Sequence, residues 1–228
     1  MLKFTPILLA VLYGLAMYRL SVWRTKRELD ARSTELADQR LRQLTDRMAA
    51  ALDLPRIRVN IYEIDPVNGL AAPDGRIFIT RGFYRKYRNG DVSAEEMASV
   101  IAHELGHVAL GHTKRRMIDF SGQNALRTAL AMILSRFLPG VGPWIANGLM
   151  SLLAAKLSRK DEYEADEYAA ALLTKAGIGV EPQKSLFRKL EDLTQARGGA
   201  MPAWLMSHPK TEERIAALDK LEARWADA

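Results

Sequence analysis

Residues 101–112 read IAHELGHVALGH, and this segment sets the expectations for the rest of the chain. It contains the pattern H-E-x-x-H at His103, Glu104 and His107. In a helix, residues four positions apart lie on one face, so both imidazoles can reach one metal ion from a single rigid element. Glu104 falls on the adjacent surface, where it can hold and deprotonate a water molecule on that metal. Neutral imidazole suits Zn²⁺, so the pattern predicts one zinc ion per chain.

The surroundings of the pattern matter, because three fixed positions in five occur by chance in roughly 1% of chains of this size. The segment SAEE, residues 93–96, is a capping box that predicts a helix from there to about Gly111. The neighbours of the two histidines are small or apolar: Val100, Ile101, Ala102, Leu105 and Val108. Two buried histidines beside a carboxylate are costly without a partner, and a metal ion supplies one. The alternative is a pair of surface histidines on an amphipathic helix.

A zinc site with two histidines needs a third ligand from the protein. The run DEYEAD, residues 161–166, contains Glu162 and Asp166, which share a helix face. The first can ligate a metal, and the second can hydrogen-bond a ligating histidine and select its tautomer. An acidic run by itself is more often a solvated helix face, and Glu164 and Glu167 remain alternatives as ligands.

A third candidate segment is SHP, residues 207–209, which precedes an expected helix that contains Arg214. A histidine before proline is most often a loop residue, but a catalytic site needs a donor for the developing oxyanion. The chain has four histidines, and two belong to the pattern above. His112 lies five residues past His107, on a different helix face, and we interpret it as structural. His208 is therefore the available imidazole.

Taken together, these segments resemble the family of zinc metallopeptidases that includes HtpX and the CAAX prenyl proteases, over residues 55–220. SRKDEYEAD, residues 158–166, is similar to the family's Ser-Arg…Glu-x-x-x-Asp pattern, and SHPKTEERI, residues 207–215, to its His-Pro motif. The resemblance implies that Glu162 is the third ligand and that Asp166 supports a histidine. It also implies that His208 stabilises the transition state and that Arg214 supports the site. We group Glu104, His208 and Arg214 as the expected catalytic residues.

A looser match is NGLAAPDGRIFITRGF, residues 68–83, which resembles the strand before the active helix. In such peptidases this edge strand binds an extended substrate by strand addition, through main-chain hydrogen bonds. The resemblance implies a substrate strand made of Arg76, Ile77, Phe78, Ile79 and Thr80.

The N-terminal segment 4–23 is mostly apolar and has the length, roughly 20 residues, that a bilayer-crossing helix needs. Arg19 lies near its end, where it can snorkel to the interface. Basic residues follow, which favours a membrane anchor that contacts lipid and leaves the catalytic part in the cytoplasm. Lys3 and the small residues at 14–16 leave a cleaved signal peptide and an exported form as alternatives.

Composition excludes several other classes. The net charge is +6, but the basic residues follow the N-terminal segment and do not form a nucleic-acid module, so no nucleic-acid partner is expected. The chain has no cysteine, which excludes disulfides, thiol nucleophiles and thiolate metal sites.

We expect a mainly helical α+β fold, with a zincin-like metallopeptidase domain whose small sheet packs on the H-E-x-x-H helix, after an N-terminal membrane helix. The expected divisions are 1–23 (anchor or signal peptide), 24–54 (juxtamembrane helix) and 55–228 (zinc metallopeptidase domain). Alternation predicts a strand at 56–64 that buries Val59 and Ile61 and turns Tyr62 to the other face. Residues 76–80, RIFIT, are expected to form a second strand. The apolar stretches 125–138 and 141–157 are interpreted as a buried or surface-lying helical hairpin, with a membrane-dipping hairpin as the alternative. Further helices are expected at 159–175, 181–197 and 210–225.

The expected function is zinc-dependent hydrolysis of peptide bonds. Glu104 takes a proton from water and passes it to the leaving amine, while zinc and His208 stabilise the oxyanion. The expected partners are protein or peptide substrates, with misfolded or membrane-associated proteins as the class that the resemblance implies. The first alternative is a non-catalytic membrane-anchored adaptor with the same fold. The second is a zinc hydrolase for a non-peptide bond. The sequence indicates no oligomeric state.

Overall fold

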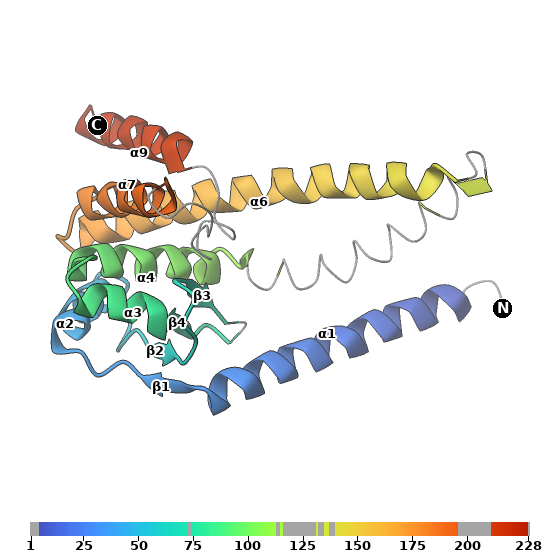
Figure 1. Ribbon diagram of the computed structural model, residues 1–228, viewed down its shortest axis with the longest axis horizontal. Helices are drawn as coiled ribbons and strands as arrows, with labels where there is room; N and C mark the ends of the chain where they lie inside the picture. Colours follow the sequence, from blue (N-terminus) through green and yellow to red (C-terminus); the bar gives the residue numbers. More distant parts are fainter. Residues whose placement is uncertain are drawn as a thin grey trace.

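A computed structural model describes residues 5–72, 74–112, 140–195 and 211–227, together with the isolated positions 115, 131, 135 and 136. The helices are α1 (Thr5–Ala31), α2 (Gln39–Ala51), α3 (Arg81–Arg88), α4 (Ala94–Ala109), α6 (Gly142–Lys175), α7 (Glu181–Gln195) and α9 (Thr211–Ala226). The strands are β1 (Ser33–Glu35), β2 (Val59–Tyr62), β3 (Gly69–Ala71) and β4 (Ile77–Thr80). The prediction of a mainly helical fold with a small sheet is confirmed (Figure 1).

The four strands form one sheet in the order β1-β2-β4-β3. Strands β2 and β4 are parallel, while β1 and β3 pair antiparallel to their neighbours. The expected substrate strand, Arg76–Thr80, was therefore placed wrongly. Its strand residues form β4, which is internal and pairs with β2 on one side and β3 on the other. Because both rows of main-chain groups face neighbouring strands, a substrate cannot add to β4.

Both faces of this sheet are covered. Val59 and Ile61 of β2 are buried in the main core, as their alternation predicted, together with Met97 and Ile101 of α4. On the opposite face, Tyr62 packs in a second cluster with Leu29, Ala72 and Phe78. The end of α1 covers this face, which explains why Tyr62 is buried although its alternation pointed to solvent.

The juxtamembrane helix that we expected within residues 24–54 is interrupted. Helix α1 ends at Ala31, residues Ser33–Glu35 pair with β2, and α2 begins only after Asp38. The Asp38 side chain caps α2 by accepting from the Leu41 N–H at 3.0 Å. The segment contains no Gly or Pro, the residues that most often interrupt a helix. The cross-strand pairing with β2 decides the break.

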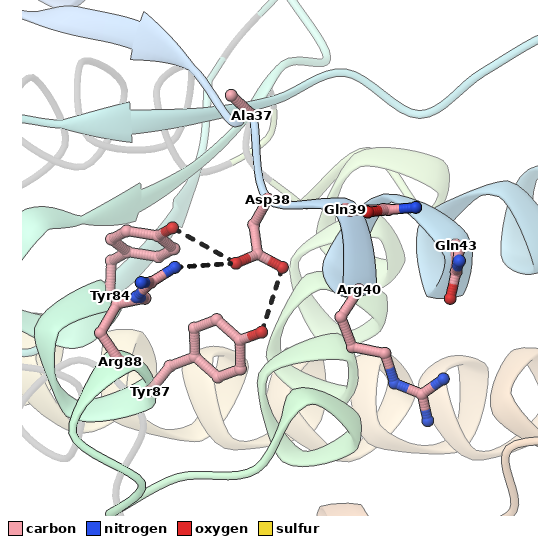
Figure 2. Close-up of a pocket in the computed structure, with 8 residues that line it drawn as sticks. All are labelled: Ala37, Asp38, Gln39, Arg40, Gln43, Tyr84, Tyr87 and Arg88. Carbon is pink, nitrogen blue, oxygen red and sulfur yellow. Dashed lines mark hydrogen bonds and ion pairs between the residues drawn. The ribbon is translucent and has the colours of Figure 1, made fainter.

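Asp38 also joins α2 to α3. It accepts hydrogen bonds from the hydroxyls of Tyr87 at 3.0 Å and Tyr84 at 3.4 Å, and Arg88 lies 3.5 Å away, as Figure 2 shows. These residues line the pocket in Figure 2, together with residues from the start of α2. None of the lining residues belongs to the H-E-x-x-H segment, so we assign these contacts to the packing of α2 against α3.

Of the two apolar stretches expected to form a hairpin, the structure describes only the second in full. Residues 125–138 lie almost wholly outside the described residues. Residues 141–157 form most of the first half of α6, which continues without a break through the helix expected at 159–175 and is 34 residues long. In the described part of the chain, none of the helices combines the length and the apolarity that crossing a membrane requires.

Candidate metal centre

Helix α4 begins where its capping box predicts. The Ser93 hydroxyl accepts from the Glu96 N–H at 3.1 Å, and the Glu96 carboxylate accepts from the Ser93 N–H at 2.7 Å. Glu96 is buried and also accepts from Lys189 and Ser185 of α7, at 2.8 and 2.7 Å. The start of α4 is thus tied to α7, which holds the helix in one position against the rest of the domain.

Helix α6 crosses α4 at the level of the motif. A Cβ atom built on Gly106 would lie 2.9 Å from the Ala165 carbonyl oxygen. The missing side chain therefore allows the two backbones to approach closely. This crossing places the carboxylates of α6 beside the histidines of α4.

Three buried side chains meet at this crossing. His103 Nε2 lies 3.1 Å from His107 Nε2 and 3.4 Å from Glu162 Oε2, and His107 Nε2 lies 3.5 Å from Glu162 Oε1. With zinc–ligand distances of about 2.0–2.1 Å, two ligand atoms of a tetrahedral site lie roughly 3.3–3.4 Å apart. The spacing of the three donors therefore fits a zinc ion, and the two imidazoles and one carboxylate are a donor set that zinc uses.

Asp166 contacts this cluster. Its Oδ1 lies 2.9 Å from His103 Nδ1, the ring nitrogen that faces away from the other donors. Arg214 of α9 donates to both carboxylate oxygens, at 2.5 and 2.6 Å, and Gln183 of α7 donates at 3.2 Å. Arg214 also lies over the Phe187 ring, at 4.3 Å from its centroid. Two further helices therefore hold the carboxylate that contacts His103.

The electrostatics of the cluster favour a cation. Burial lowers the pKa of His103, but hydrogen bonds to Asp166 and Glu162 outweigh burial and raise this pKa to about 9. Burial raises the pKa of Asp166, but Arg214 and His103 outweigh it and hold that pKa below its ordinary value. The carboxylates thus favour a positive charge between them, which a divalent metal ion also provides.

The expected site residues have the following positions. His103, Glu104, His107, Glu162 and Asp166 are all buried within this region. Arg214 is 1% exposed, and its contacts with Asp166 make it a positioning residue, although we grouped it with the catalytic residues. His208 lies outside the described residues, so its role stays a prediction.

The two alternative ligands on α6 are placed elsewhere. Glu167 is exposed and lies 3.9 Å from Arg224. Glu164 points to His112, with 3.0 Å between Oε2 and Nε2. Sequence reasoning missed two contributions to the site, those of Gln183 and His112. Gln183 carried no local signal. His112 was visible in the motif segment but was assigned to another helix face.

Substituting Gly106 with Ala is expected to separate α4 from α6, because the added Cβ meets the Ala165 backbone. We expect a loss of about 1–3 kcal/mol in the free energy of unfolding, as for overpacked cores. Zinc affinity should fall as well, since the three candidate ligands lie on the two separated helices. Urea unfolding and chelator competition measure both effects.

The matched control for this prediction is Gly14→Ala in α1, where a Cβ would meet nothing within 4 Å. It should be neutral or slightly stabilising, because Ala favours a helix over Gly. If Gly106→Ala were as mild as Gly14→Ala, the close crossing would not be needed for the site.

Comparison with known proteins gives one family. The model of Peptidase family M48 matches residues 35–222. Metalloprotease LoiP of Escherichia coli (strain K12) is 30% identical, over 77% of this chain and 67% of LoiP. A protease HtpX homolog of Salinibacter ruber is 30% identical, over 95% of this chain and 88% of that protein. The human mitochondrial metalloendopeptidase OMA1 is 26% identical, over 72% of this chain and 32% of OMA1. The chain thus spans about two thirds of LoiP and about a third of OMA1.

Proposed function

This chain belongs to peptidase family M48 and is a zinc metalloendopeptidase, and from that premise we propose how its residues act and what it cuts. The assignment of the zinc ligands rests on the buried triangle of His103, His107 and Glu162, whose donor atoms lie 3.1–3.5 Å apart. We propose that these three side chains hold the zinc ion. Bound zinc supplies a Lewis acid that polarises the scissile carbonyl and lowers the pKa of water.

Glu104 is the proposed general base. It follows His103 directly on α4 and is 2% exposed, which keeps bulk solvent away from its carboxylate. The carboxylate takes a proton as water attacks the peptide carbonyl, and it returns that proton to the amine as the C–N bond breaks. His208 is proposed to donate to the developing oxyanion, on the resemblance of its His-Pro motif.

Strand β3 replaces β4 as the proposed substrate strand. It is the terminal strand of the sheet within the described residues, beyond β4. A Cβ on Gly69 would lie 3.5 Å from Glu104 Oε1, so β3 runs directly beside the proposed base. An extended peptide added to β3 would pass next to Glu104, which supports unfolded or locally unfolded proteins as substrates.

We also propose attachment to a membrane surface. Helix α1 exposes Leu12, Tyr13, Leu15 and Trp23, and the start of α6 exposes Trp144. In the view of Figure 1, these two helices extend from the domain on the same side. Basic residues follow the apolar part of α1, and such residues favour anionic headgroups on the cytoplasmic leaflet. Misfolded or membrane-associated proteins are therefore the substrate class that we propose.

The test is digestion of an unfolded model protein by the purified full chain in detergent, with bound zinc counted. We expect new N-termini, loss of cleavage after chelation, and recovery when one equivalent of zinc is added. If the zinc-loaded protein retained the unfolded protein without cutting it, the adaptor alternative would replace this proposal. Cleavage of a simple ester without cleavage of peptides would favour the hydrolase of a non-peptide bond.

A further inference from the structure

His112 is fully buried beside the metal centre. Its Nδ1 lies 3.0 Å from Nδ1 of His107, and the two rings meet nearly edge to face, with centroids 5.2 Å apart. On the other side of the ring, Nε2 lies 3.0 Å from Glu164 Oε2 and 3.7 Å from Asp161 Oδ1. His112 therefore links a proposed zinc ligand to the acidic side of α6.

The end of α4 brings His112 to this position. The helix ends at Ala109, and Gly111 adopts a φ of +70°, in the left-handed region that glycine favours at helix ends. In a continuous helix, the fifth residue after His107 would point to another face. Because the chain turns at Gly111, His112 instead folds back against the His107 ring.

The hydrogen-bond pattern allows one consistent set of neutral tautomers. His107 directs Nε2 toward the other two proposed ligands, so its proton belongs on Nδ1. The Nδ1–H of His107 then donates to Nδ1 of His112, which accepts. His112 consequently carries its proton on Nε2 and donates to the Glu164 carboxylate. With Nε2 protonated, His112 is not available as a ligand for a second metal beside Asp161 and Glu164.

We propose that His112 is a positioning residue for the zinc ligand His107. It accepts the Nδ1–H bond that holds the His107 ring and its tautomer, and Glu164 holds His112 in turn. Asp166 has the same role for His103, so each histidine ligand has its own partner. This inference rests on the proposed zinc site, but it does not depend on which substrate is cut.

The test compares His112→Leu with His112→Asn in the full-length protein. Asn keeps a hydrogen-bond acceptor, because its Oδ1 is bonded to Cγ as Nδ1 of histidine is. Leu fills part of the same space but has no acceptor. We expect Leu to weaken zinc binding by about 10–100-fold, as for lost partners of metal-ligating histidines, and Asn to recover most of that loss. The readouts are the zinc dissociation constant from chelator competition, the number of zinc ions per chain, and the visible spectrum of the Co²⁺ form.

A second pair of variants tests the link to Glu164. Glu164→Ala should weaken zinc binding by a smaller factor than His112→Leu, because it only loosens His112. Glu167→Ala is the matched control on the same helix, since its exposed side chain lies near Arg224. It should bind zinc like the wild type.

Three results would overturn the inference: wild-type zinc affinity in His112→Leu, equal weakening in Leu and Asn variants, or two zinc ions per chain with one lost in His112→Leu. If the unmodified protein bound zinc but cut no peptide, the proposed function would be contradicted. The comparisons of zinc affinity among the variants would still test the role of His112. The failures of the two proposals are therefore distinguishable.

Discussion

Replacing Glu104 with Gln is expected to lower kcat for peptide cleavage by about 10²–10⁴-fold, while the protein keeps one zinc ion per chain. Gln has nearly the same shape as Glu but cannot take a proton from water at neutral pH. The three proposed ligands are unchanged, because Glu104 is not among the donors that meet at 3.1–3.5 Å. Cleavage rates of an unfolded protein and metal analysis of the same sample measure the two quantities.

Glu95→Gln is the control for this result, because Glu95 lies in the first turn of the same helix and pairs with Arg40. It should cleave like the wild type. If Glu104→Gln kept more than about a tenth of the wild-type cleavage rate, Glu104 would not be the general base. Loss of zinc from Glu104→Gln would instead mean that the carboxylate helps to hold the metal.

Replacing Arg214 with Met is expected to lower the free energy of unfolding by about 3–5 kcal/mol, because it leaves a buried carboxylate without its counter-charge. Arg214 is 1% exposed and donates to both oxygens of Asp166, so water cannot take its place easily. Zinc affinity should also fall, by about 10–100-fold, since Asp166 would no longer be held against His103. Chemical unfolding of the metal-free protein and chelator competition separate the two effects.

Arg224→Met on the same helix is the matched control. Its side chain is 70% exposed and lies 3.9 Å from Glu167, so its loss should cost less than about 1 kcal/mol. The double variant Arg214→Met with Asp166→Asn should recover part of the stability, because no unpaired charge remains, while zinc binding stays weak. An Arg214→Met variant as stable as Arg224→Met would contradict the role assigned to the buried pair.

Much of the active helix could be predicted from the sequence because its signals are local. The capping box at Ser93 and Glu96 forms as expected, and the spacing of His103 and His107 brings their Nε2 atoms to 3.1 Å. These contacts join residues three or four positions apart, which helix geometry relates directly. The choice of Glu162 over Glu164 and Glu167 came from the family resemblance, and the contacts of all three agree with it.

Elements that depend on distant partners were predicted less well. The break between α1 and α2 and the internal position of β4 follow from strand pairing, which a local pattern does not report. The sequence identified residues 76–80 as a strand, but the pairing with β2 and β3 decides that neither edge of β4 is open. The same limit explains why we propose β3 in place of β4 as the substrate strand.

The sequence by itself determined which groups the candidate site contains: two imidazoles and a carboxylate on one capped helix, followed by a carboxylate helix and an arginine. Tertiary structure decided how these groups are held. Asp166 and Arg214 reach His103 across 63 and 111 residues, through helix packing at the Gly106 crossing. His112 reaches His107 because the chain turns at Gly111 and α6 supplies Glu164. Helical periodicity relates neighbours in the chain, whereas the packing of whole helices brings together residues that no local pattern connects.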